Sequence, residues 1–151
     1  MSDKRALYIE EKIIEAVRRL LSGRVNELLG EMEYPLPLIE FTDYQGGSTV
    51  VPNINLSACE RTEKERIILQ DAYSLNITFA LPENLESEIQ CYAYAGAIGR
   101  ALYDDPTLSG VADRTVITSK KYTSPKKSNC GEGWELAVSL RIIVEGMGNA
   151  G

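Results

Sequence analysis

The sequence predicts an α+β fold in which two main helices pack on one face of an antiparallel sheet of about four strands, in the order α-β-β-α-β-β. Large apolar residues alternate strictly with small or polar ones over residues 73–81. A second alternation of this kind runs over residues 134–144, and an amphipathic helical pattern follows the first. Each long strand therefore has one apolar face, which helices lying on a single side can cover.

The length and charge of the chain limit its class. With 151 residues, 44% of them hydrophobic and 25% charged, residues 1–151 are expected to form a single domain, with residues 1–6 and 146–151 as mobile tails. The net charge of −6 opposes direct binding to nucleic acid or to an anionic membrane. No apolar run approaches the roughly 20 residues that span a bilayer.

The first part of the chain, residues 7–30, has the pattern of one long helix. Gly23 interrupts this pattern and indicates either a bend or two successive helices, and Gly30 is suited to the C-terminal cap. Pro35 and Pro37 then favour an extended connection. The apolar stripe of the predicted helix at residues 7–30 consists of Ile13, Val17, Leu20, Leu21, Val25 and Leu28.

Residues 38–42 are predicted to form the first short strand, and an irregular segment follows at residues 43–53. Gly46-Gly47 and Pro52-Asn53 favour turns in this segment. The segment and the residues after it are too apolar for a free linker, so we expect them to fold back onto another surface. The apolar residues are Val50, Val51, Ile54 and Leu56.

The central strand, residues 73–81, leads through Pro82 into the second helix, which ends at Asp104-Asp105-Pro106. Small residues at Gly96 and Gly99, with Ala93 and Ala97, are expected to let this helix approach the sheet closely. Strands are predicted over residues 115–123 and 134–144, with a polar loop between them. The apolar face of the second helix is predicted to hold Leu85, Ile89, Tyr92, Ala93, Gly96, Gly99, Leu102 and Tyr103.

The composition opposes most catalytic and metal chemistry. The chain has no histidine, which removes the usual general base and the commonest metal ligand. Cys59, Cys91 and Cys130 are far apart, without the spacing of a zinc site or a disulfide framework. We therefore predict no enzyme activity, no catalytic residues, no metal site and no cofactor.

Two regions are candidates for contacts with other subunits or partners. The first is the apolar segment around Tyr44, Val50, Val51 and Ile54, which is typical of an arm that becomes ordered on a neighbour. The second surrounds the final hairpin, whose cations either solvate the loop and protect a sheet edge or bind an acidic protein. Those cations include Lys120, Lys126 and Lys127. A ring of identical subunits would use both regions, because cyclic oligomers join one patch to a different patch of the next copy.

Three segments resemble one family: the strand at residues 73–81, the helix end Ile98-Gly99-Arg100-Ala101-Leu102-Tyr103-Asp104-Asp105, and the closing strand at residues 134–145. Together with the opening helix, they resemble the tail terminator (tail-completion) proteins of long-tailed bacteriophages and prophages over most of the chain. The resemblance implies a homo-oligomeric ring, commonly a hexamer, that caps the tail tube and contacts the head-side connector. It implies no enzyme activity and no cofactor, and a location in the virion tail and, during assembly, in the host bacterial cytoplasm.

Two alternatives remain open. The neighbouring head–tail joining proteins of phages are a rival assignment. The second alternative is a module that binds a small molecule or peptide in a pocket near Tyr73, Tyr92 and Trp134, although these aromatic residues occupy core-facing positions.

Overall fold

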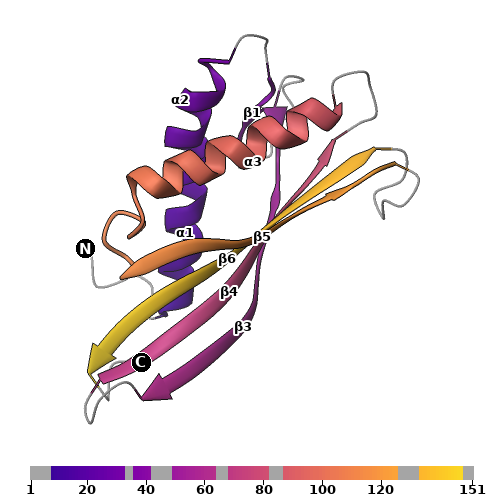
Figure 1. The fold of residues 1–151 in the computed structure, drawn as a ribbon. Coiled ribbons are helices and arrows are strands. Elements are labelled where there is room, and N and C mark those ends of the chain that lie inside the picture. The colour runs from indigo at the N-terminus through magenta and orange to yellow at the C-terminus, as the bar shows by residue number, and fades with distance from the viewer. Residues whose placement is uncertain are drawn as a thin grey trace.

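The computed structural model describes residues 8–32, 36–41, 49–63, 68–81, 87–125 and 133–147. Its helical elements are α1 (Ile9–Leu20), the π-helix η2 (Leu21–Val25), α2 (Asn26–Leu29) and α3 (Ser87–Asp104). Its strands are β1 (Leu38–Ile39), β2 (Thr49–Val50), β3 (Asn53–Glu63), β4 (Ile68–Leu81), β5 (Arg114–Thr123) and β6 (Trp134–Met147) (Figure 1).

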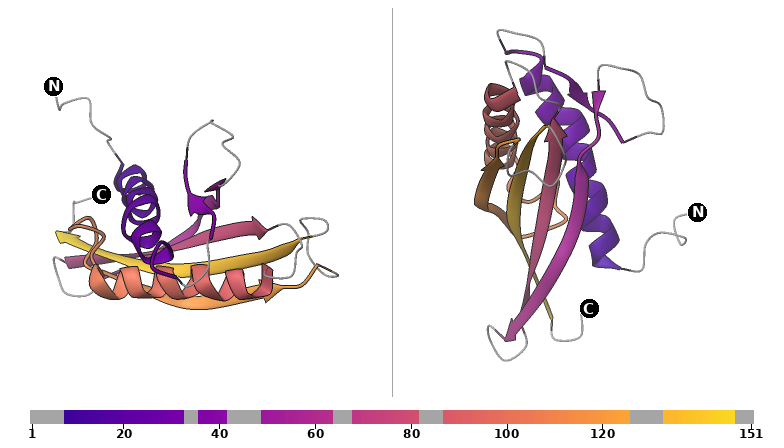
Figure 2. Two further views of the ribbon diagram at one scale, coloured as in Figure 1. Left: turned by 90° about the horizontal axis from the view of Figure 1, so that it is seen from above. Right: turned by 90° about the vertical axis from the view of Figure 1, so that its right-hand side faces the viewer.

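The four long strands form one antiparallel sheet in the order β3-β4-β6-β5. This confirms the predicted α+β class and its antiparallel sheet. The strands twist strongly about one another, as right-handed strand twist requires in long strands (Figure 1). In the right-hand view of Figure 2, the lower end of the sheet extends beyond α1.

The alternation along β4 and β6 determines which face of the sheet the helices cover. One row of side chains is buried in a single core together with residues of α1, η2 and α3. That row consists of Tyr73, Leu75, Ile77, Phe79 and Leu81 on β4 and Leu136, Val138, Leu140 and Ile142 on β6. Ser74, Asn76 and Thr78, on the other face of β4, are only half-buried and lie outside this core. Both main helices therefore pack on one face, as predicted.

The first strand of the sheet was predicted in the wrong place. Residues 38–39 do form a strand, but it pairs in parallel with β2 in a separate two-stranded sheet. The strand that completes the main sheet is β3, which has charged residues at Glu60, Arg61 and Glu63. A bulge between Leu56 and Ala58 shifts its register, so its sequence lacks the clean alternation by which the other strands were found.

The side of α3 that faces the core was predicted only in part: Leu102 is buried as predicted, Ile89 is exposed, and Leu85 lies outside the described residues. Its buried residues include Cys91, Tyr94 and Ile98, whereas Tyr92 and Tyr103 are exposed. Tyr94 stacks on Phe79 of β4 with ring centroids 4.9 Å apart, and its hydroxyl donates a hydrogen bond to the carbonyl oxygen of Pro37 at 2.6 Å. Because α3 is apolar nearly all round, helical spacing could not show which side faces the core.

The glycines of α3 differ in their relation to the sheet. A Cβ atom built at Gly99 would lie 3.7 Å from Ile117 Cδ1 of β5, so α3 does approach the sheet there. A Cβ built at Gly96 would have nothing within 4 Å. The close approach predicted for Gly96 is therefore wrong.

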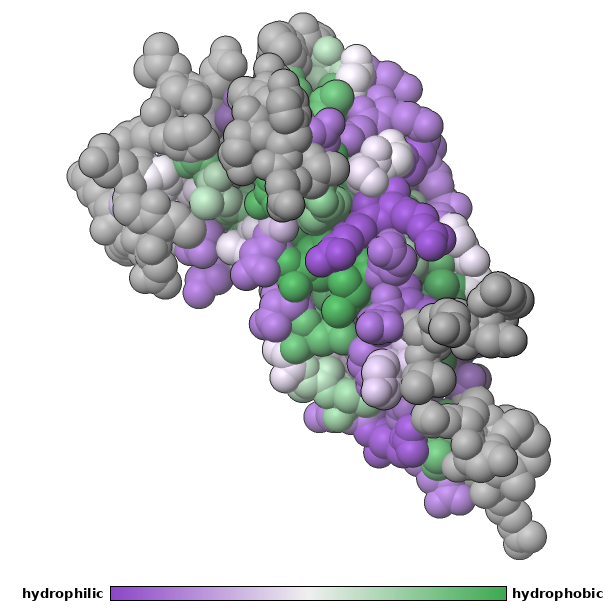
Figure 3. Space-filling view, turned by 180° about the vertical axis from the view of Figure 1, so that it is seen from behind, coloured by the Kyte–Doolittle hydropathy of each residue, from purple (hydrophilic) through white to green (hydrophobic). Residues whose placement is uncertain are grey.

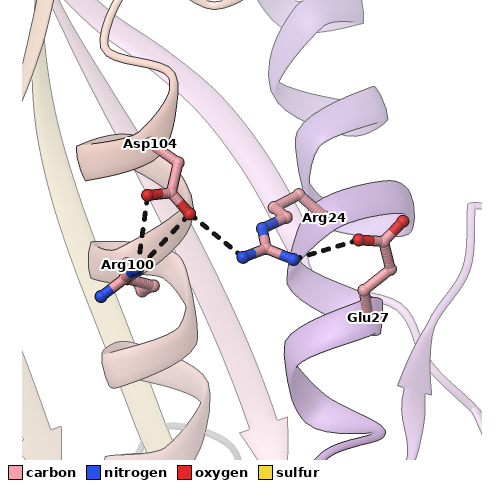
Figure 4. A network of polar contacts seen from close by, with 4 residues as sticks. All are labelled: Arg24, Glu27, Arg100 and Asp104. Carbon is pink, nitrogen blue, oxygen red and sulfur yellow. Dashed lines mark hydrogen bonds and ion pairs between the residues drawn. The ribbon is translucent and has the colours of Figure 1, made fainter.

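A polar network joins the opening helices to the end of α3 (Figure 4). Arg24 of η2 forms ion pairs with Glu27 at 3.1 Å and with Asp104 of α3 at 3.2 Å. Arg100 binds the same Asp104 carboxylate at 3.3 Å. The opening pattern thus continues as one helix through a π-helical turn around Gly23, and Arg24 in that turn reaches α3.

The predicted tails fall partly outside the described residues. Residues 1–6 and 148–151 lie there, so the structure does not test them. Gly146 and Met147, which were assigned to the C-terminal tail, instead belong to β6 and pair with Leu69 and Ile68.

Candidate interaction surfaces

The structure places four of the seven candidate contact residues. Val50 and Ile54 are half-buried and pack against the core of their own subunit. Val51 is 53% exposed, and Lys120 is exposed on β5. Tyr44, Lys126 and Lys127 lie outside the described residues. Of the placed candidates, Val51 and Lys120 are therefore the exposed ones; Val51 lies between β2 and β3, and Lys120 lies on β5.

The two edge strands carry opposite charges. Within the described sheet, β3 and β5 are the outermost strands, and most of their residues are exposed. The acidic residues of β3 are Glu60 and Glu63, and the charge of Arg61 on this strand is balanced by Asp71 of β4. On β5 the charged residues are Arg114, Lys120 and Lys121, with no carboxylate in the strand. One edge is therefore acidic and the other basic.

The face of the sheet away from the helices carries mostly small and polar side chains. On this face, Asn55 of β3 lies opposite Asn76 of β4, and Asn76 lies opposite Ser139 of β6. Ala137 of β6 lies opposite Lys121 of β5. The hydroxyl of Ser139 donates a hydrogen bond to Oδ1 of Asn76 at 2.8 Å. Figure 3 shows the molecule from behind, and in this view hydrophobic residues gather in the middle of the surface and hydrophilic residues border them. The side chains of this sheet face are thus mostly small or polar, unlike those of the core-facing side.

A polar cluster lies where β3 and β4 pass the start of α1. The Arg61 guanidinium donates two hydrogen bonds to Asp71, from Nε at 2.6 Å and from Nη2 at 2.8 Å. These bonds lower the pKa of Asp71 below its usual 3.8. The hydroxyl of Tyr73 donates to Glu10 Oε2 at 3.3 Å, and burial raises the pKa of that phenol. The hydrogen bonds of this cluster connect the acidic edge strand β3 to β4, and β4 to α1.

Asp71→Asn is expected to lower the melting temperature near neutral pH by no more than a few degrees, because Arg61 is half exposed. The folded-state pKa of Asp71 is lower than the unfolded-state value. Its stabilisation is therefore complete above about pH 4–5 and is lost as the pH falls through the folded-state pKa. Melting curves of both proteins at several pH values should converge below pH 3.8. A difference that persists unchanged in acid would show that Asp71 does not act through its charge.

Neither described cysteine is an activated nucleophile. Burial raises the pKa of Cys91 to about 11, and desolvation raises the pKa of the exposed Cys59. Both side chains are therefore thiols near neutral pH. In the described ranges, no three His, Cys, Asp or Glu side chains come together in a way that could hold a metal ion.

An exposed apolar stripe on α3 consists of residues that the sequence pattern assigned to the core-facing side of this helix. Ile89, Tyr92 and Tyr103 are 47%, 48% and 79% exposed, and with Gly96 they follow the spacing of one helix side. We call these four residues the α3 stripe. Tyr92 is held in place by a hydrogen bond to Glu88 at 2.7 Å and by an edge-to-face contact with Tyr122 of β5 at 5.2 Å. A stripe of this kind is typical of a surface that another protein covers.

The three aromatic residues suggested for a ligand pocket do not meet. Tyr73 is buried beside the start of α1, whereas Tyr92 is on the outer side of α3. Trp134 pairs with Leu81, eight residues along β4 from Tyr73, which corresponds to about 26 Å. One pocket cannot contain all three.

Comparison with known proteins assigns no family. A scan against protein-family models gives no match, and a search of curated proteins gives none either. Among the described helices, none has the length and apolar character needed to cross a membrane.

Proposed function

We propose that this chain is a structural subunit of a phage or prophage tail, and that copies of it close into a ring. In this role it is a tail terminator that caps the tail tube and contacts the head-side connector, in the virion tail and, during assembly, in the host cytoplasm. The observation that carries the proposal is the opposite charge of the two edges of one long antiparallel sheet. The proposed ring size is a hexamer, as the family resemblance implies.

The topology supports edge-to-edge assembly. Three antiparallel pairings separate β3 from β5, so these two strands run in opposite directions. When copies are related by rotation, β5 of one copy meets β3 of the next in antiparallel orientation, and the ladder of main-chain hydrogen bonds can continue. The small and polar sheet face then forms one continuous wall of the ring.

The edge charges also select the pairing. Two β3 edges would join strands that both carry net negative charge, and two β5 edges would join strands that both carry net positive charge, so both pairings are repulsive. Only β3 against β5 joins edges of opposite net charge. Each edge strand also has a bulge, between Leu56 and Ala58 in β3 and between Ile117 and Ser119 in β5, and bulges limit non-specific strand addition.

Charge reversal of one edge tests the proposal. Lys120→Glu with Lys121→Glu is expected to abolish the ring, because each junction then joins two acidic edges. A four-site variant that also has Glu60→Lys and Glu63→Lys exchanges the signs of the two edges and should restore it. Light scattering measures the assembly mass, and circular dichroism checks that each variant is folded. A ring that persists in the two-site variant, or a failure of restoration in a folded four-site variant, would refute pairing through these edges.

A further inference from the structure

The α3 stripe contains a recess of the shape that a side chain from a facing helix fills. Gly96, Gly99, Arg100 and Tyr103 occupy positions i, i+3, i+4 and i+7, the four positions that outline a hole in helix packing. Gly96 leaves one side of this hole open, because nothing lies within 4 Å of a Cβ built there. Beside it runs an open groove of about 290 Å³ between α2 and α3, lined by Leu28, Glu31, Met32, Gly96, Ala97 and Arg100.

The same helix also carries a side chain that fits this recess. Tyr92 lies one turn before Gly96, is 48% exposed, and is fixed by its contacts with Glu88 and Tyr122. It cannot bend into a recess on its own helix side, because neighbouring side chains of one helix lie next to each other rather than opposite. A tyrosine ring that fills the recess would therefore come from a second helix. In Figure 1 no other labelled element crosses the outer side of α3.

We infer that α3 binds α3 of a second copy of this chain, antiparallel and about a two-fold axis near Gly96. Ile89 and Tyr103 lie seven residues before and after Gly96, so this axis places Ile89 of each copy against Tyr103 of the other. Tyr92 of each copy enters the hole of the other. A two-fold contact uses one patch on both copies, so both insertions form together. This self-complementarity favours a second copy over an unrelated partner.

The charges beside the stripe give this pairing one favourable contact and one like-charge contact that neighbouring arginines offset. From Ile89 to Gly99, α3 has no charged residue. Arg100, at the wall of the hole, already lies 5.8 Å from the centre of the Tyr103 ring and would meet a second ring in Tyr92 of the other copy. Asp104 would approach Glu88 of the other copy, but Arg24 and Arg100 already balance its charge.

The contact area indicates a weak dimer. The exposed parts of Ile89, Tyr92 and Tyr103 amount to roughly 300–500 Å² per copy. Two copies would bury roughly 600–1,000 Å² in total, below the ~1,200 Å² of a stable interface. This contact goes beyond the proposed ring: it closes at two copies, uses neither sheet edge, and would join two rings or two free subunits.

Cross-linking at the axis is the most specific test, because only a two-fold axis brings a residue next to its own counterpart. With Cys59 and Cys130 replaced by serine, Gly96→Cys is expected to form a covalent dimer with a short bis-maleimide at about 100 µM protein. Gly23→Cys is the matched control, since Gly23 is also an exposed helical glycine with open space at its Cβ. Cross-linking of Gly96→Cys no greater than that of Gly23→Cys would overturn the inference.

Sedimentation provides the second measurement. Between about 5 and about 500 µM, the wild type should show a species of twice the basic mass, whether that basic unit is a subunit or a ring. Tyr92→Ala and Gly96→Leu should reduce its association constant at least about tenfold, and Tyr8→Ala, an exposed tyrosine away from the stripe, should not. Unchanged doubling in folded Tyr92→Ala would also overturn the inference. Loss of the ring through the edge variants would leave this doubling intact, so the two proposals fail separately.

Discussion

Phe79→Ala is expected to lower the free energy of unfolding by about 3–5 kcal/mol. Phe79 is completely buried in the central strand and stacks on Tyr94, with an angle of 19° between the rings. Truncation removes the contact through which β4 holds α3 and leaves a cavity between sheet and helix. Urea denaturation followed by circular dichroism measures the loss, which is a large share of the roughly 5–15 kcal/mol by which a domain is stable.

Tyr94→Phe is the control for this prediction. It keeps the stacked ring but removes the hydrogen bond to the carbonyl oxygen of Pro37, so we expect a loss of only about 0.5–1.5 kcal/mol. If Phe79→Ala cost no more than Tyr94→Phe, the contact between Phe79 and α3 would not be a main support of the core.

Asn26→Ala is expected to lower the free energy of unfolding by about 2–4 kcal/mol. The Asn26 side chain binds both main-chain groups of Ile39: its Nδ2 donates to the Ile39 carbonyl at 2.9 Å, and its Oδ1 accepts from the Ile39 amide at 2.8 Å. Ile39 is completely buried, so alanine would leave two buried polar groups without a partner. Thermal melts measure the loss, and hydrogen exchange at the Ile39 amide should become faster.

Asn26→Asp separates the two hydrogen bonds. Near neutral pH, aspartate can still accept from the Ile39 amide but cannot donate to its carbonyl, so this variant should also lose stability. Protonation restores a donor, so its deficit should shrink as the pH falls through the aspartate range. Equal stability of wild type and Asn26→Ala would contradict the role assigned to Asn26.

The parts of the fold that the sequence predicts are those in which one physical pattern dominates. β4 and β6 alternate cleanly because one face is core and the other is not, so both were found, although β4 begins five residues before the predicted start at residue 73 and β6 continues three residues beyond residue 144. β3 was missed because it is an edge strand: little of it is buried, its charges are tolerated, and its bulge breaks the period of two. The pairing of β1 with β2 was missed because a two-residue strand has no period.

The α3 stripe shows the other limit of sequence interpretation. Helical spacing shows that Ile89, Tyr92 and Gly96 share one side of α3, but Tyr94 and Ile98 form an equally apolar side. Which side of α3 faces the core depends on the residues that each side contacts. Tyr94 contacts Phe79 and Pro37, which are distant from it in the sequence. The edge charges of β3 and β5 were visible as residues, but their relation depends on the strand order.

The mass of the wild-type particle in solution tests the central claim most directly. Multi-angle light scattering at micromolar concentration, with negative-stain images of the same fraction, should show closed rings whose mass is a multiple of 16.7 kDa and corresponds to six subunits. A particle of 16.7 kDa at every concentration, with no rings in the images, would contradict the proposal that this sheet closes into a ring through its opposite edges.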